Sequence, residues 1–385
     1  MLEYLSAAFI LLFILSPAWA APFDGTGFVV ERDGALPKRV DKALVNDFKY
    51  WSEWSAASYC PAQVNATGGK VTCGSYGICP GLESVPTKVI NTWLDVGGDK
   101  GATGASGATG FVGIDNAKKM VVVSMRGSVS VQNWVTDIKF ALQDCPEFGT
   151  GARCETGFYS FWQDSKPAAM DGLKKAFAEV PDYNIVVTGH SLGAAAAVYA
   201  AAELRTTYKN KDVWLYNYGQ PRAGNMALSS YVTNQGKNFR VTHTSDIVPR
   251  LPWESVTALV ADKDIYAHIS PEYWITDGLG NNPKNYKVLE GNKNYDGNAA
   301  NSWGKFNIVA HIQYYQTNMY GCTLSFLPMG MASLIGIGYQ AGSRKRFASN
   351  NGEFDREMRP EQLAEAGVRG AFTREWRVPS EGSWS

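Results

Sequence analysis

Two kinds of hydrophobic pattern alternate along the middle of the chain. Short runs of apolar and β-branched residues at 183–188, 213–218 and 239–244 favour β-strands. Apolar positions at helical spacing favour helices at 167–180, before the first run, and at 225–234, between the other two. Strands that alternate with helices are typical of an α/β protein, so we predict a predominantly parallel central sheet with flanking helices.

The region before residue 167 follows a different pattern. Residues 47–58 favour a helix with an aromatic face, and strand-like runs follow at 87–94, 110–115 and 119–124. Asn116-Ala117 stands between the last two runs and predicts a hairpin turn. After the third strand of the middle region we expect a long loop region.

The sequence Gly-His-Ser-Leu-Gly at 189–193 lies between a predicted strand and an alanine-rich segment, 194–204, that favours a helix. A G-x-S-x-G motif in that context predicts a nucleophile elbow, in which Ser191 sits on a sharp turn with its hydroxyl exposed. The two glycines let strand and helix approach closely, and the helix N-terminus offers N–H groups to a developing oxyanion. Ser191 is therefore the candidate nucleophile.

A serine nucleophile needs a base, and a further group that orients the base. In elbows of this kind the chain order is Ser, then Asp or Glu, then His. Asp246 comes just after the third predicted strand of the middle region and fits the acid. The chain has four histidines, and two drop out because His190 lies in the elbow and His243 precedes the acid. The residues themselves leave His268 and His311 as equal candidates for the base.

Two groups are candidates for holding an oxyanion: the backbone N–H of Leu192, directly after the nucleophile, and Ser128, just past the 119–124 run. The next segment carries four apolar residues at i, i+3, i+4 and i+7, which make one helix face. These residues are Val131, Trp134, Val135 and Ile138. Such a face either packs on the core or forms a lid that covers the site in water and turns toward lipid.

Charge and targeting signals narrow the class of protein. Lys plus Arg equals Asp plus Glu at 36 each, so no bulk charge argues for a nucleic-acid partner. Residues 1–20 combine an apolar core with an Ala-x-Ala site and predict a signal peptide; a membrane anchor would need about 20 apolar residues. We expect 21–39 to be a pro-segment ending at the dibasic pair Lys38-Arg39, which is otherwise an ordinary exposed charge pair.

Six cysteines fit an oxidising compartment, outside the cell, and allow fifteen disulfide connectivities. Two pairs are close neighbours in sequence and each suits a small loop, which leaves a third pair that spans the chain. These pairs are Cys73 with Cys79, Cys145 with Cys154, and Cys60 with Cys322. A zinc site is the alternative, but no C-x-x-C spacing occurs and we expect no metal. Asn65 begins the one N-glycosylation sequon, Asn-Ala-Thr.

The chain after the last cysteine differs in composition from the rest. Residues 325–338 are apolar, a basic triplet follows, and a polar stretch runs to the end. The apolar run is too short for a membrane span, and a GPI signal would end in such a run rather than precede a charged one. We therefore expect a catalytic domain at 40–322 and a loosely ordered or processed extension at 323–385.

These motifs together resemble the secreted fungal lipases of class 3, the triacylglycerol lipases of filamentous fungi. The similarity covers about 40–322 and rests on many collinear landmarks. Besides the elbow, these are Ser-Ala-Ala-Ser-Tyr-Cys at 55–60, Arg-Gly-Ser at 126–128, Asn133-Trp134, 218–225, 241–252, His268 with 270–274, and Ala310-His311 with Tyr314-Tyr315. The resemblance implies an α/β-hydrolase-like fold with a short helical lid. It also implies a monomer that needs no cofactor and acts on lipid esters at an oil–water interface.

The resemblance further implies a role for single residues. His268 falls in a stretch that is structural in the family, so His311 is the expected base. The implied roles are nucleophile, acid and base for Ser191, Asp246 and His311, oxyanion donor for Ser128, and lid tryptophan for Trp134. The family's cysteine pairing is the one given above.

Two departures from the family pattern leave the substrate preference open. Met125 stands where the family usually has Phe, and Ala194 replaces a common glycine, a variant also seen in feruloyl esterases and some partial-glyceride lipases. A feruloyl esterase on the same fold is one alternative, but its flap tends to be polar and fixed, whereas the face at 131–138 is apolar. A non-catalytic lipid-binding protein is another, but it would tolerate the loss of Ser, Asp or His, and none is lost.

Overall fold

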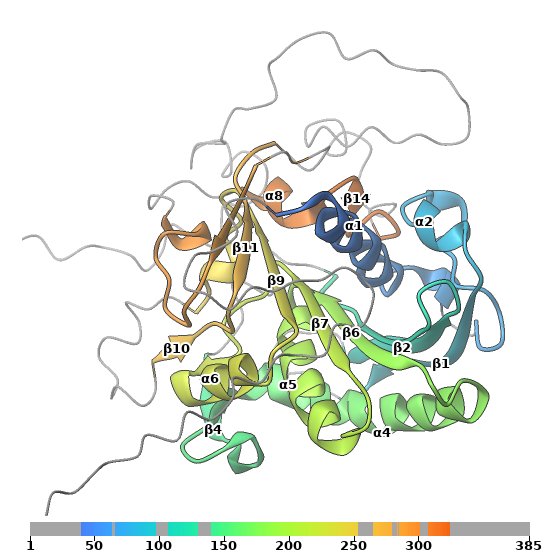
Figure 1. Cartoon of the computed structure of the whole chain (residues 1–385), viewed down its shortest axis with the longest axis horizontal. Coiled ribbons are helices and arrows are strands. Elements are labelled where there is room, and N and C mark those ends of the chain that lie inside the picture. Colours follow the sequence, from blue (N-terminus) through green and yellow to red (C-terminus); the bar gives the residue numbers. More distant parts are fainter. Residues whose placement is uncertain are drawn as a thin grey trace, which may run out of the picture. The chain divides into compact units, whose positions relative to one another are not determined.

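An eight-stranded sheet forms the centre of the fold in a computed structural model of the chain (Figure 1). In order across the sheet, its strands are β1 (Thr87–Val96), β2 (Ala108–Asp115), β3 (Met120–Met125), β6 (Asn184–His190), β7 (Val213–Tyr218), β9 (Asn238–His243), β11 (Glu272–Ile275) and β12 (Tyr286–Leu289). From β3 to β11 neighbouring strands run parallel. The pairs β1/β2, β2/β3 and β11/β12 are antiparallel.

The structure describes residues 40–63, 66–97, 107–129, 140–252, 265–278, 283, 285–300 and 307–323. All of these residues belong to one unit of the chain. Within these ranges no helix is long and apolar enough to cross a membrane. The expected signal peptide, the pro-segment and nearly all of the C-terminal extension lie outside the described residues, so the domain boundaries stay predictions.

Helices cover both faces of the sheet. Figure 1 shows α1 (Lys42–Ala57) on one side and α4 (Thr156–Glu179) and α5 (Leu192–Thr207) on the other. Helix α1 packs on β3, β6 and β7, α4 on β1 and β2, and α5 on β6 and β7. Because both faces are covered, β2 and β3 are buried at every position, and their sequences are largely apolar runs rather than a clean alternation.

Helix α1 shows how the sequence directs this packing. Asp41 caps its N-terminus, because the side chain accepts a hydrogen bond from the Leu44 N–H at 2.7 Å. Phe48, Trp51 and Trp54 recur at helical spacing and are buried against the sheet. Burying each of these rings contributes roughly 3 kcal/mol, more than the helix propensity of any single residue.

Shorter elements surround this core. A second sheet, in the order β10-β8-β5-β4, consists of strands of two or three residues. The remaining strands are β4 (Leu142–Asp144), β5 (Arg153–Glu155), β8 (Gly224–Asn225), β10 (Tyr266–Ala267), β13 (Gln313–Tyr314) and β14 (Thr317–Asn318). Within the described residues, the remaining helices are α2 (Pro80–Glu83), α6 (Met226–Asn234) and α8 (Ile308–Ile312), with 3-10 turns at Pro61–Gln63, Gly74–Tyr76, Pro146–Phe148, Val248–Arg250 and Asn298–Ala300.

The predicted fold class is confirmed, and three details of the prediction are wrong. Helix α4 begins at Thr156 rather than at Pro167, because Glu155 caps it there and Pro167 lies inside the helix. Helix α1 begins at Lys42, five residues before the expected start. The expected loop region after residue 244 contains β11 and β12, which complete the sheet. Each of these strands has only four residues, too few for a clear period in the sequence.

Three disulfides join the six cysteines, in the pairing that the sequence analysis expects. They are Cys60–Cys322, Cys73–Cys79 and Cys145–Cys154. The first closes a loop with a sequence separation of 262. In the chain-entropy model such a long closure stabilises the folded state by on the order of 5 kcal/mol.

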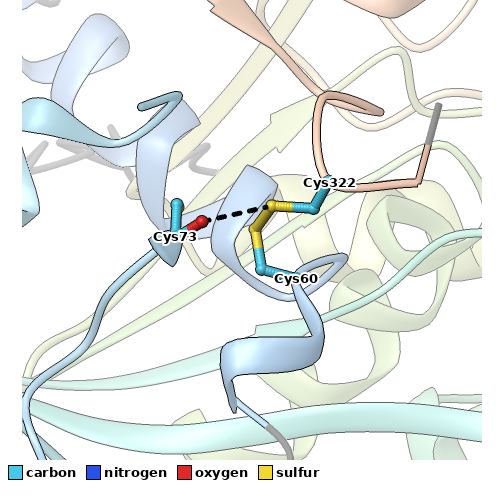
Figure 2. Close-up of side chains that lie close together, drawn as sticks. All are labelled: Cys60, Cys73 and Cys322. Carbon is cyan, nitrogen blue, oxygen red and sulfur yellow. Dashed lines mark hydrogen bonds between the residues drawn. A yellow bond between two sulfur atoms is a disulfide. The ribbon is translucent and has the colours of Figure 1, made fainter. Parts of the chain in front are cut away.

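Three of the sulfurs lie close enough together to suggest a metal site, and their bonding argues against one. The Sγ atoms of Cys60, Cys73 and Cys322 lie within 4.8 Å of one another. Figure 2 shows the Cys60–Cys322 bond beside the backbone carbonyl of Cys73, whose oxygen is 3.8 Å from Cys322 Sγ. Each of the three sulfurs is already in a disulfide, so none of them is a thiolate that can bind zinc.

The buried carboxyl of Glu155 makes stability depend on pH. Its Oε2 accepts a hydrogen bond from the Phe158 N–H at 2.7 Å, at the start of α4. Burial nevertheless raises the pKa of this carboxyl from 4.5 to about 7. Because the folded-state pKa is the higher one, the stabilisation is complete below about pH 4.5 and is lost as the pH rises to about 7.

We predict that Glu155→Gln removes this pH dependence, since the amide oxygen can still accept from Phe158 but carries no proton equilibrium. Between pH 5 and pH 8 the free energy of unfolding of the wild type should fall by up to about 3 kcal/mol more than that of the variant. Denaturant titrations at the two pH values measure this. Glu290→Gln, at an exposed carboxyl, should behave like the wild type; equal slopes for wild type and Glu155→Gln would contradict the prediction.

Candidate active site

Ser191 occupies the turn between β6 and α5, where the sequence predicts the elbow. Its backbone has φ 60° and ψ −129°, a conformation that is costly for a residue with a side chain. The turn is tight because strand and helix nearly touch. A Cβ on Gly189 would lie 2.3 Å from the Gly193 carbonyl oxygen, and a Cβ on Gly193 would lie 2.3 Å from the Met125 oxygen. Only glycine fits at either position.

Asp246 and His311 meet although 65 residues separate them. Asp246 lies in the turn after β9, His311 lies in α8, and His311 Nδ1 is 2.9 Å from Asp246 Oδ2. The same Oδ2 accepts a hydrogen bond from the Tyr314 hydroxyl at 2.8 Å, and Oδ1 accepts one from the Val248 N–H at 2.9 Å. The carboxylate is thus fully buried but has three donors.

This contact determines which nitrogen of His311 is available for chemistry. A carboxylate only accepts, so Nδ1 carries the hydrogen and Nε2 keeps a lone pair. Within the described residues neither His311 Nε2 nor Ser191 Oγ has a hydrogen-bond partner. Both residues are 0% exposed, so substrate reaches them only after the chain that covers them moves.

Gly219 makes room for the acid and the base. It follows β7 at φ +57°, and a Cβ there would lie 2.9 Å from His311 Nδ1 and 3.0 Å from Asp246 Oδ2. Glycine is therefore required at this position for two reasons: the backbone conformation, and the lack of space beside the two side chains.

A network of buried polar side chains holds the turn that carries Asp246. The Asn298 side-chain amide donates to the Thr244 oxygen at 3.0 Å and to the Asp246 oxygen at 2.9 Å. The Asn298 backbone N–H donates to Glu272 Oε1 at 3.1 Å. Glu272 in turn pairs with Arg240 at 3.3 Å, across the parallel strands β9 and β11. The acid is thus tied to strands β9 and β11 of the sheet.

The candidate oxyanion donors lie where β3 ends against the elbow. A Cβ on Gly127 would lie 3.0 Å from Ser191 Cβ, which shows how close this loop comes to the serine. Ser128 Oγ is buried and makes no hydrogen bond within the described part of the chain, while its carbonyl accepts from the Tyr320 hydroxyl at 2.8 Å. Leu192 is the first residue of α5, so its N–H has no acceptor within the helix.

The alternative base, His268, is placed elsewhere. Its Nε2 lies 2.6 Å from the Pro249 carbonyl oxygen, which makes that nitrogen a donor. Burial, with Arg240 and Arg222 nearby, lowers its pKa well below the ordinary value. Of the two histidines that the residue patterns alone left equal, His311 is thus the one that contacts Asp246.

Some expected residues lie outside the described part of the chain. These are the four residues of the apolar face, Val131, Trp134, Val135 and Ile138, and the sequon residue Asn65. Sequence reasoning also missed three contributors to the site: Gly219, Tyr314 and Asn298. Tyr314 had a weak signal, an aromatic three residues after His311; nothing near Asn298 pointed to the acid.

The fold and the order of these residues define a class of protein. A serine at a strand-to-helix turn, an aspartate after a later strand and a histidine after that are the arrangement of α/β hydrolases. The chain belongs to the class 3 lipase family. Residues 122–256 match the family described as Lipase (class 3).

Named relatives and solved structures agree with this membership. The chain is 38% identical over 288 residues to "Secreted mono- and diacylglycerol lipase A" of Penicillium cyclopium, covering 73% of this chain and 88% of the relative. It is 38% identical to "Secreted mono- and diacylglycerol lipase 1" of Fusarium solani, covering 71% and 76%. The crystal structure of a mono- and diacylglycerol lipase from Aspergillus oryzae superposes with a TM-score of 0.64 at 38% identity, over 74% of this chain and all of that one.

We predict that Gly219→Ala lowers kcat by roughly 10- to 100-fold, because the added methyl group displaces the Asp246–His311 pair. Turnover of a soluble ester per folded molecule measures this. Gly236→Ala is the matched control: Gly236 has φ +76° but nothing within 4 Å of its would-be Cβ, so it carries the backbone strain without the collision. Equal activity in the two variants would show that Gly219 matters for its backbone alone.

Proposed function

We propose that the chain is a secreted serine esterase that hydrolyses the ester bonds of acylglycerols. The observation that carries the proposal is the Asp246–His311 contact at 2.9 Å, with the His311 ring packed on His190 of the elbow, in a member of the class 3 lipase family. The three disulfides and the predicted signal peptide support an extracellular protein, and the relatives named above are described as secreted. We further propose that it acts as a monomer at a lipid surface.

The proposed mechanism assigns one step to each side chain. His311 Nε2 takes the Ser191 proton as Ser191 Oγ attacks the ester carbonyl, and Asp246 stabilises the imidazolium that forms. The Leu192 N–H and Ser128 hold the tetrahedral oxyanion. His311 then gives its proton to the leaving alcohol, and an acyl-enzyme remains until water, activated by the same histidine, releases the fatty acid.

The substrates within this class are proposed to be mono- and diacylglycerols. The two relatives named above, each at 38% identity, carry that description, whereas the relative from Rhizomucor miehei, at 29%, is named only "Lipase". Ala194 does not decide between partial glycerides and feruloyl esters, because alanine at this position occurs both in some partial-glyceride lipases and in feruloyl esterases.

Access to the site is proposed to depend on a lid at 131–138. Ser191 and His311 are fully buried, so some covering segment must move before an ester reaches them. The apolar face Val131, Trp134, Val135 and Ile138 follows the oxyanion loop directly in sequence. Val129, at its near end, is a large apolar residue that is 47% exposed. Contact with lipid would offset the cost of exposing such a face to water.

We predict that Ser191→Ala and His311→Ala each lower kcat by roughly 10⁴-fold or more in a protein that still folds. His268→Ala should lower it far less, because His268 bonds a remote carbonyl. Hydrolysis of emulsified monoolein, diolein, triolein and methyl ferulate by the purified protein measures both activity and preference. Full activity in Ser191→Ala would overturn the proposed function, and turnover of methyl ferulate alone would replace it with a feruloyl esterase.

We predict that activity rises steeply once the substrate exceeds its solubility limit, because a lipid surface then stabilises the open state of the lid. Trp134→Ala should weaken this rise while leaving turnover of a dissolved short-chain ester nearly unchanged. Initial rates across the solubility limit of tributyrin measure the effect. A smooth Michaelis curve through that limit, the same in both proteins, would mean that the 131–138 segment is a fixed wall of the site.

A further inference from the structure

His190, which directly precedes Ser191, makes a hydrogen bond with the backbone of His311, the proposed base. Its Nε2 lies 2.8 Å from the carbonyl oxygen of His311. Its Nδ1 lies 2.9 Å from the hydroxyl of Tyr59, which comes just after α1. The two imidazole rings also pack together, with their centroids 4.4 Å apart and their planes 35° from parallel. His190 itself is fully buried, and the mechanism above gives it no task.

The chemistry of each partner determines which atom donates and which accepts in these hydrogen bonds. A carbonyl only accepts, so His190 Nε2 donates to His311. Burial lowers the pKa of His190 well below its ordinary value, and the charge of His311 acts in the same direction, so the ring is neutral. Nδ1 therefore accepts from the Tyr59 hydroxyl, and that hydroxyl accepts from the Gly127 N–H at 3.1 Å.

The result is a continuous line of hydrogen bonds through three parts of the site. It begins at Gly127, beside the oxyanion candidate Ser128, and passes through Tyr59 to His190, beside Ser191. It ends on the main chain of His311 in α8. Helix α8 has only five residues, so its own hydrogen bonds position it weakly. An external bond to its main chain therefore limits where the base can lie.

A second histidine holds the same helix from the other side. His243 Nδ1 lies 3.0 Å from the Ala310 oxygen and 2.9 Å from the Gln313 oxygen, on either side of His311. The Asn307 side chain caps the helix by accepting from the Val309 and Ala310 N–H groups. Loss of the His190 bond should thus let α8 shift slightly without releasing it from the fold.

We propose that His190 is a positioning residue, which holds the base His311 in register with Ser191 and Asp246 and is itself oriented by Tyr59. The proposal rests on the proposed function, since it concerns the same site. It explains why a histidine suits this position: one ring presents a donor to α8 and an acceptor to Tyr59 at once. An aliphatic residue of similar size would offer neither.

Two amide variants separate the two bonds. In His190→Gln the amide nitrogen falls near the position of Nε2 and can still donate to the His311 carbonyl. In His190→Asn the shorter amide falls near Nδ1, so it can still accept from Tyr59 but does not reach α8. Tyr59→Phe removes the hydroxyl that orients the ring and that also accepts from the Gly127 N–H. Tyr199→Phe is the control, because it removes another buried hydroxyl that bonds backbone carbonyls, those of Ala223 and Glu155.

The experiment measures kcat and KM for p-nitrophenyl butyrate from pH 4 to pH 9, per active site titrated with a p-nitrophenyl phosphonate. In His190→Asn we expect kcat to fall about tenfold with KM nearly unchanged. We also expect the acid limb of kcat/KM to move to lower pH by about half a unit, because a displaced His311 is less well stabilised by Asp246. His190→Gln should recover most of both effects, Tyr59→Phe should be intermediate, and Tyr199→Phe should leave the acid limb in place.

The pH profile separates positioning from general stability. A merely structural role would lower the melting temperature and the titrated fraction of sites but leave the acid limb unmoved. The proposal is overturned if His190→Asn keeps the wild-type acid limb and kcat per site, or if His190→Gln is as impaired as His190→Asn. If His190→Asn does not fold, Tyr59→Phe carries the readout, and an unmoved acid limb in it overturns the proposal. Failure of the proposed function looks different, because the wild type would then lack ester turnover or Ser191→Ala would retain it.

Discussion

The hydrogen bond between Asp246 and His311 is the interaction on which the arrangement of the site depends. A carboxylate taken out of water loses several kcal/mol of hydration, and it stays charged only if donors replace the water. Here the ring N–H of His311, the Tyr314 hydroxyl and the Val248 N–H supply three. These donors come from α8, β13 and the turn after β9, so segments far apart in sequence must meet at one carboxyl group. Gly219 leaves the space in which they do so.

A network of hydrogen bonds and an ion pair connects the turn that carries Asp246 to strands β9 and β11. Arg240 and Glu272 face each other on parallel strands as an ion pair with almost no exposure, and Glu272 also accepts from the Asn298 N–H. Asn298 then holds the carbonyls of Thr244 and Asp246. A buried ion pair contributes little net stability but is costly to break, since removal of one partner leaves an uncompensated charge. Loss of either Arg240 or Glu272 would therefore leave an unpaired charge buried in the network that reaches the acid turn.

The chemistry of the site requires burial and access at different times. A dry environment strengthens the contact of His311 with Asp246 and would strengthen the hold of backbone donors on an oxyanion. The same environment keeps substrate out, and in this structure the nucleophile and the base are covered completely. A lipase acts where a lipid surface is present, and such a surface can stabilise an exposed apolar face that water does not. The proposed lid would open the site where such a surface is present.

The sequence by itself determined the elbow, the nucleophile, the fold class and the long elements, because each depends on neighbouring residues. A strand run, G-x-S-x-G and an alanine-rich helix suffice to place Ser191, and apolar runs identify β3, β6, β7 and β9 among the parallel strands of the sheet. Asp246 followed from its place after a strand, and the resemblance to a family selected His311 where the residue patterns could not. Only the tertiary structure decided that Gly219 packs on the acid and base, that Asn298 ties the acid to Glu272, and that His190 bonds the main chain of His311. The tertiary structure also showed that β11 and β12 complete the sheet. These contacts join residues up to 121 positions apart, and a short strand or a single polar side chain carries no local pattern that names so distant a partner.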